Sequence, residues 1–224
     1  MLQNIVKWIS TVAMVTPLLC AADLGSYRNF QLGMNLTAVQ KQAEMKPSEV
    51  KVIHQRPALI QDLEWRPLRF PGPSPESDPV KDVLFSFYNG QLFRMVVNYD
   101  RYRTEGMTTQ DMVDAISAIY GPAAQTSDEV IFPSVYNENV KVLARWEDGQ
   151  HSVNLVRAPY QPSFALVALS KQLDTLVQAA VLIAKRLDQE EAPQREAALQ
   201  DKQVEDVRVQ QEKARLVNKP GFRP

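Results

Sequence analysis

The chain has 224 residues, of which 25 are basic and 26 acidic, and it contains two histidines and one cysteine. This balance offers no strongly basic surface, which argues against nucleic-acid binding. A single cysteine excludes an internal disulfide framework and a cysteine-rich metal site.

The first 22 residues are typical of an export signal. Lys7 is their only charge, the segment from Ile9 to Cys20 is mostly apolar, and Cys20-Ala21-Ala22 places small residues before a cleavage site. The apolar run is too short and interrupted for a membrane span of roughly 20 residues. We therefore expect cleavage after Ala22 and a periplasmic or secreted protein without a thiol or a transmembrane span. The alternative is a lipoprotein signal with a lipid on Cys20, although Leu19 stands where that signal prefers a small residue.

The most informative feature is a short sequence motif that occurs twice. Gly33-Met34-Asn35 and Gly106-Met107-Thr108 each introduce an amphipathic segment with helical spacing, and a predicted β-hairpin follows each segment. A helix and a hairpin that recur in the same order indicate a duplicated α+β unit. We expect the first unit to cover about 27–100 and the second about 101–169.

The elements expected in the first unit are short and separated by prolines. A strand at 27–32 precedes a helix at 36–44, which Asn35 caps and which ends before Pro47. Alternating patterns predict strands at 49–56 and 60–65. The five prolines between Pro67 and Pro79 predict an exposed loop rather than a ligand for a proline-binding domain.

Asn89-Gly90 predicts the first hairpin with a two-residue type I′ turn that pairs Tyr88 with Gln91. Pairing outward from this turn predicts one face with Val83, Phe85, Phe87, Leu92 and Val96, interrupted by Arg94. The opposite face would carry Leu84, Tyr88, Phe93, Met95, Val97 and Tyr99. Because both faces are apolar, we expect other elements to cover this hairpin on both sides.

The second unit repeats this plan with different detail. Thr108 and Asp111 predict a capped helix that ends at Gly121-Pro122, with a stripe of Met112, Val113, Ile116, Ile119 and Tyr120. Asp148-Gly149 predicts a second two-residue hairpin turn, also of type I′ with a positive φ at the glycine. The predicted buried face of this hairpin carries Val142, Ala144, Trp146, His151, Val153 and Leu155. The predicted solvent face carries Lys141, Arg145, Glu147, Gln150, Ser152 and Asn154. A further strand is expected at 163–169.

From Ser170 onward the pattern becomes helical. The segment 170–192 carries an apolar stripe that predicts packing against the domain: Leu173, Leu176, Val177, Ala180, Ile183, Ala184 and Leu187. Pro193 is expected to kink or break the helix. The segment 193–224 predicts a charged helical tail whose apolar residues are too sparse for a regular heptad. Either this tail stays solvated, or it becomes ordered against a partner or a second copy of the chain.

The repeated helix start and the hairpin turns resemble the SmpA/OmlA (BamE-like) family and the two-repeat fold of the β-lactamase inhibitor proteins. This resemblance covers residues 27 to 169. It implies helices packed on an antiparallel sheet in a small exported protein that acts by binding other proteins. The lipid anchor usual in BamE-like proteins and the disulfides of the inhibitors have no counterpart in the expected mature chain. From this resemblance we expect the same fold and a protein-binding function, but we assign no site residue.

The sequence supports no catalytic, cofactor-binding or metal-ligating residue. His54 and His151 are about a hundred positions apart without a neighbouring carboxylate motif, and packing or a satisfied hydrogen bond is the expected role of His151. No Gly-x-Ser-x-Gly elbow or phosphate-binding glycine loop occurs. The adjacent acids Glu147-Asp148 and Glu190-Glu191 are expected to be turn or surface charges rather than an acid–base pair.

The expected function is therefore protein–protein interaction in the periplasm or cell envelope, as an adaptor, assembly factor or inhibitor-like binder. A candidate interaction surface is the second apolar face of the first hairpin, at Tyr88, Phe93, Met95 and Tyr99. The alternatives are an enzyme that acts on cell-wall material and a module that binds a small ligand or lipid between sheet and helices.

Overall fold

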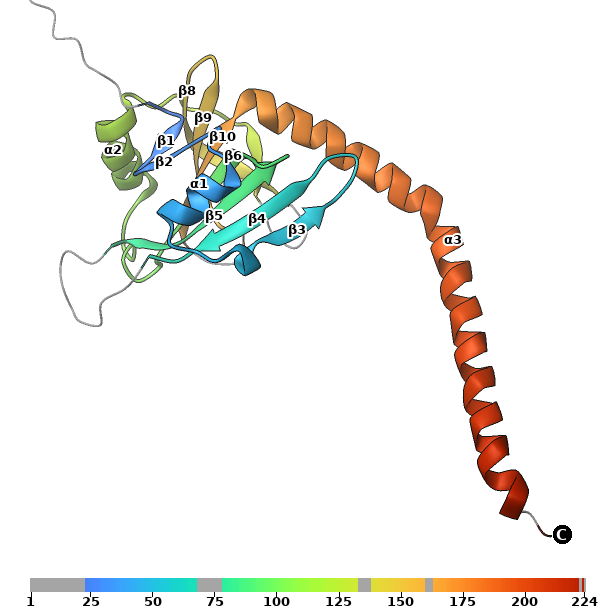
Figure 1. Cartoon of the computed structure of the whole chain (residues 1–224). Coiled ribbons are helices and arrows are strands. Elements are labelled where there is room, and N and C mark those ends of the chain that lie inside the picture. Colours follow the sequence, from blue (N-terminus) through green and yellow to red (C-terminus); the bar gives the residue numbers. More distant parts are fainter. Residues whose placement is uncertain (1–22, 68–77, 133–137, 160–162, 222, 224) are drawn as a thin grey trace, which may run out of the picture.

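The computed structural model describes residues 23–67, 78–132, 138–159, 163–221 and 223, so the expected export signal and Cys20 lie outside the described residues. The fold is mixed α+β. It combines an eight-stranded antiparallel sheet, a two-stranded sheet and a long C-terminal helix that extends away from the domain (Figure 1).

The large sheet consists of two meanders of four strands that meet in the middle. Its strands follow one another in space as β3-β4-β5-β6-β10-β9-β8-β7. The first meander comprises β3 (Lys51–His54), β4 (Ile60–Trp65), β5 (Val80–Tyr88) and β6 (Gln91–Tyr99). The second comprises β7 (Glu129–Phe132), β8 (Glu138–Glu147), β9 (His151–Arg157) and β10 (Phe164–Ser170). Pairing of β6 with β10 joins them and buries both central strands.

The expected single strand at 27–32 is wrong. Two short strands, β1 (Ser26–Tyr27) and β2 (Phe30–Gln31), form a small hairpin instead, with Arg28 at a φ of 54° in the turn. Alternation of side chains does not reveal such a tight turn, because residues on both sides of it keep the same polar pattern. The loop expected at 67–79 lies largely outside the described residues.

Helices α1 (Leu36–Gln42) and α2 (Thr109–Tyr120) begin as the sequence predicts. The Asn35 side chain accepts a hydrogen bond from the Ala38 N–H at 2.8 Å, and Thr108 and Asp111 form a capping box. Gly33 and Gly106, two residues before these caps, both have a positive φ, at 89° and 78°. A short 3₁₀ turn, η1 (Pro47–Glu49), follows α1.

Both helices pack on the same face of the sheet and cover the main core. This core combines buried side chains of α1 and α2 with the side chains that one face of the sheet presents to them: Val39, Ala43, Leu63, Val83, Phe85, Phe87, Met95, Met112, Ile116, Trp146, Val153, Leu155 and Leu166. Ile119, expected in the α2 stripe, is 58% exposed.

The first hairpin has the predicted turn, with Asn89 at φ 47° and Gly90 at φ 80°, and the predicted pairing of Tyr88 with Gln91. The predicted faces beyond it are partly wrong. The register shifts beside Phe93, so that Ser86 pairs with Arg94 while Phe87 pairs with Leu92. One extra residue in β6 reverses the side-chain direction of every residue after it. Met95, Val97 and Tyr99 therefore join the main core, whereas Val96 lies on the other face.

The second hairpin differs from the prediction in its turn and in its outer face. Residues 148–150 separate β8 from β9, and the Asp148 carboxylate accepts hydrogen bonds from the N–H groups of Gln150 and His151. Gly149 has no positive φ, so the predicted type I′ turn is wrong. Hydrogen bonds to the Asp148 carboxylate stabilise this turn, so it does not need a glycine with a positive φ.

The face predicted to meet solvent is exposed at Lys141, Glu147 and Gln150, as expected, but it is buried nearer the centre of the sheet. Asn154 and Ser152 are only 1% and 5% exposed, and a register shift in β8 also moves Val142 to this face. Asn154 accepts a hydrogen bond from Arg145 and donates one to Ser152, so these polar groups are satisfied inside the fold.

Candidate interaction surface

Helix α3 (Lys171–Asn218) packs on the face of the sheet opposite α1 and α2. The predicted apolar stripe is confirmed in part: Val177, Ala180 and Ala184 are buried, whereas Leu176 and Ile183 are 45% and 47% exposed. Val177 of this helix forms a cluster with the buried side chains of Ile60 in β4 and Phe93 in β6. Glu191 then forms an ion pair with Arg56, which lies in the connection between β3 and β4. Helix α3 therefore crosses the sheet from its centre to the β3 edge.

An arginine lies beneath this crossing helix. Within the described part of the chain, the buried Nε atom of Arg94 has no hydrogen-bond partner, and one Nη atom donates to the Ser86 hydroxyl at 3.4 Å. Burial lowers the pKa of Arg94, although the negative charges of Asp62 and Asp174 act in the opposite direction. Burial likewise raises the pKa values of Asp62 and Asp174, against the effect of the Arg94 charge. The Arg94 charge therefore stabilises the two carboxylates, and they stabilise it, where the helix removes these groups from water.

Pro193 marks the point at which the helix leaves the domain. The helix continues through this proline, and Figure 1 shows it changing direction in its middle part. Proline cannot donate the hydrogen bond of its turn, which bends a helix. The Arg195 guanidinium donates to the backbone oxygen of Asp188 at 3.0 Å and to its carboxylate at 2.9 Å. This contact spans the bend and gives the backbone carbonyl group of Asp188 a hydrogen-bond donor.

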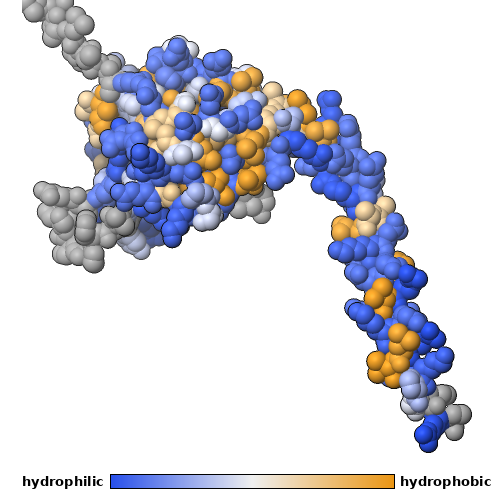
Figure 2. Space-filling view, in the orientation of Figure 1, coloured by the Kyte–Doolittle hydropathy of each residue, from blue (hydrophilic) through white to orange (hydrophobic). Residues whose placement is uncertain are grey.

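Beyond the bend, the segment 193–221, here called the arm, has no buried or half-buried residue. Five large apolar side chains of the arm are at least half exposed: Leu199 (61%), Val204 (70%), Val207 (52%), Leu216 (60%) and Val217 (77%). Figure 2 shows separate hydrophobic groups along this otherwise hydrophilic part of the helix. A short 3₁₀ turn, η2 (Lys219–Gly221), ends the arm.

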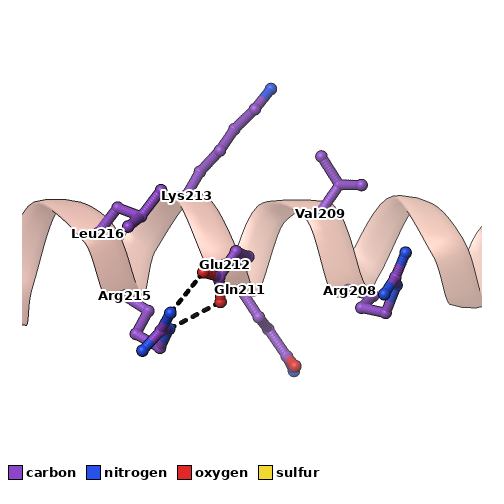
Figure 3. Close-up of a pocket in the computed structure, with 7 residues that line it drawn as sticks. All are labelled: Arg208, Val209, Gln211, Glu212, Lys213, Arg215 and Leu216. Carbon is purple, nitrogen blue, oxygen red and sulfur yellow. Dashed lines mark hydrogen bonds and ion pairs between the residues drawn. The ribbon is translucent and has the colours of Figure 1, made fainter.

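The side chains in the last turns of α3 provide an open surface rather than a cavity. Figure 3 shows seven of them, including the ion pair between Arg215 and Glu212 at 2.6 Å. Val209 projects from the side of the helix opposite Gln211 (Figure 3). Because all seven come from one helix, a ligand bound there would be covered on one side only.

A polar groove lies between α3, β7 and the outer strands of the second meander, with a volume of about 460 Å³. Its side chains bind one another. Arg145 contacts the Asp128 carboxylate at 2.6 Å, and Lys171 contacts the Glu147 carboxylate at 2.8 Å. These ion pairs engage Arg145, Lys171 and Glu147 of the groove with charges of the protein itself.

The four residues predicted as an interaction surface are divided between the two faces of the sheet. Phe93 and Met95 are fully buried, Phe93 beneath α3 and Met95 in the main core. Tyr88 borders the Phe93 cluster and Tyr99 the main core, each partly buried. The structure therefore does not bring them together at the surface, because the register shift in β6 and the cover of α3 separate them.

The edge of the sheet carries an exposed apolar surface that the sequence analysis did not identify. Val52 and Ile53 of the edge strand β3 are 48% and 45% exposed, and Leu182 and Ile183 of α3 are 69% and 47% exposed. Figure 2 shows a hydrophobic area over β3 and β4 beside α3. In the sequence, only the apolar residues of β3 indicate this surface. Alternation alone does not distinguish an edge strand from a central one.

The two histidines lie in different parts of the sheet, on β9 and on the edge strand β3. His151 packs against Gly25, where an added methyl group would lie 2.8 Å from the imidazole ring, and its Nδ1 is 3.7 Å from the Asp148 carboxylate. His54 lies on β3 at the opposite edge of the sheet. Among the described residues, no cluster of three metal-ligating side chains occurs.

Comparison with family models, with curated proteins and with solved structures gives no match for this chain. Within the described ranges, no helix has the length and apolar character needed to cross a membrane.

Proposed function

We propose that this chain is an exported, non-enzymatic protein-interaction module of the periplasm or cell envelope, which serves as an adaptor, assembly factor or inhibitor-like binder. The arm is its principal contact element. The observation that carries this proposal is that α3 leaves the domain at the β3 edge and continues with every residue of the arm exposed.

The energetics of an isolated helix support this role. Each charge pair, such as Glu205–Arg208 at 2.8 Å, contributes only about 0.2–0.5 kcal/mol in an exposed helix. Pro193 opposes helix continuity by about 3 kcal/mol. A helix of this kind gains most of its stability from a packed face. A partner that covers Val204 and Val207 would supply such a face.

We also propose that the domain is a duplicated unit with the architecture of BamE-like proteins or of the β-lactamase inhibitor proteins, as its repeated sequence motif suggests. Two observations support the duplication. Each unit has a positive-φ glycine, a capped helix and then a meander of four strands. The two meanders are also placed symmetrically about the β6–β10 pair. In such folds an exported domain acts by presenting surfaces to other proteins.

Cross-linking in envelope extract tests the proposed function. The full chain and a chain truncated after Pro193 serve as bait, and a Val52→Ser/Ile53→Ser variant controls for capture by the apolar sheet edge. We expect specific protein partners that depend on the arm and persist in the edge variant. Equal capture by the truncated chain would show that the arm is not the contact element.

The polar groove favours one second candidate, the binding of a small polar ligand. Its lining is dominated by charged and amide side chains, which suits a polar molecule better than a lipid. A ligand screen by thermal shift, with Arg145→Ala as the control, tests this candidate. A stabilising compound should lose its effect in that variant.

A further inference from the structure

Acidic and basic side chains are separated along the last part of α3, with the acidic ones before the basic ones. Between Asp188 and Asp206 there are seven acidic and two basic side chains, whereas residues 207–219 carry four basic and one acidic side chain. All of them lie on one continuous helix, α3, and on the η2 turn that ends it. Two such helices side by side attract each other when they run in opposite directions and repel each other when they run in the same direction.

The side chains on one face of the arm form a palindrome. Residues spaced alternately by three and four positions lie along one stripe of a helix. In the arm this stripe reads Ala197, Gln200, Val204, Val207, Gln211 and Ala214. The order alanine, glutamine, valine, valine, glutamine, alanine is the same in both directions.

We propose that two copies of this chain pair through their arms as an antiparallel coiled coil centred between Val204 and Val207, a partner assignment that rests on the proposed role of the arm. In this register Val204 packs against Val207 of the second copy. Gln200 meets Gln211, and Ala197 meets Ala214. Every layer therefore joins side chains of the same type, and a two-fold axis relates the two arms.

The flanking charges agree with this register. Asp201 lies beside the stripe and makes no ion pair within the described part of the chain. In the antiparallel pair it approaches Arg208 of the second copy. In a parallel pair the corresponding flanking contact would place Glu196 against Asp201, which is repulsive.

The remaining apolar residues provide a matched control. Val209 and Leu216 are seven positions apart and lie on the opposite side of the helix from the stripe, as Figure 3 shows for Val209 and Gln211. They are also exposed, at 40% and 60%. Substitution of either pair by lysine adds the same charge to the same helix, but only the pair Val204 and Val207 lies in the proposed seam.

Sedimentation velocity tests the association in a full chain with Cys20→Ser. We expect a monomer–dimer equilibrium that weakens at high salt, because the attraction between opposite charges is screened. The Val204→Lys/Val207→Lys variant should dimerise at least about tenfold more weakly, since the seam would bury unpaired charge. The Val209→Lys/Leu216→Lys variant should dimerise like the parent. A monomer at all concentrations, or equal effects of both variants, would overturn the proposal.

Cysteine cross-linking tests the orientation in the same background. Chains with Ala197→Cys should cross-link to chains with Ala214→Cys, but neither should cross-link to itself. In the antiparallel pair, two copies of residue 197 are about 25 Å apart along the helix at 1.5 Å per residue. Self-cross-linking of both single variants would show a parallel pair and overturn the proposal. If the arm captures another protein but forms no dimer, this inference fails and the proposed function stands.

Discussion

Substitution of Val177 by asparagine should reveal how strongly the first half of α3 holds the domain together. The Val177 side chain is 8% exposed and packs with Ile60 and Phe93, which are 5% and 0% exposed. Burial of a valine contributes about 1.5 kcal/mol or more. An unsatisfied amide in its place costs about 1–3 kcal/mol.

We therefore expect Val177→Asn to lower the free energy of unfolding by about 3 kcal/mol. For a protein of this size each kcal/mol corresponds to about 2–4 °C, so Tm should fall by roughly 6–12 °C. Leu182→Asn is the control on the same helix, because Leu182 is 69% exposed. This variant should lose only about 0.5 kcal/mol through helix propensity.

Thermal and urea unfolding monitored by circular dichroism measure both variants. Similar losses in the two proteins would mean that α3 does not dock on the sheet through Val177. A large loss only in Val177→Asn would identify residues 171–191 as part of the domain, in contrast to the arm.

Three further outcomes follow from the structure. Gly90→Val should cost about 1 kcal/mol or more because Gly90 has a φ of 80°, whereas Gly149→Val should unfold like the parent since its site is open and its φ is not positive. Asp174→Asn should be more stable than the parent at neutral pH, because burial raises the folded-state pKa of Asp174. The parent therefore loses stability as pH rises from the ordinary aspartate pKa through that raised value. Urea unfolding should show that the gain of the variant disappears in acid. Truncation after Pro193 should leave Tm nearly unchanged, because every residue removed from the described part of the arm is exposed; a large fall would place the arm in the core.

Local elements were predictable where a few neighbouring residues decide the conformation. Asn35 and Thr108 cap their helices through side-chain contacts within three residues, and Asn89-Gly90 forms its turn through backbone geometry alone. The apolar stripe around Val177 likewise predicted a docked helix. In each case the signal and the structure lie within one turn or one helix.

The faces of the sheet were not predictable to the same extent. A single extra residue beside Phe93 moved Met95 and Tyr99 into the core and so divided the predicted interaction surface. A register shift costs little locally, and the packing of the whole sheet selects it. Pattern alone could not indicate that α3 would cover Phe93, because that contact joins residues far apart in the chain.

The sequence by itself determined the α+β composition, the helix caps, the first hairpin turn, the docked stripe of α3 and the sparse apolar content of the arm. These properties depend on side chains a few positions apart, where sterics and short hydrogen bonds dominate. Only the tertiary structure decided which strands pair, where register shifts reverse the faces, and that α3 leaves the sheet beside Arg56 with its arm uncovered. Those features depend on how surfaces distant in the chain fit together, and burial of their combined apolar area selects among the possible arrangements.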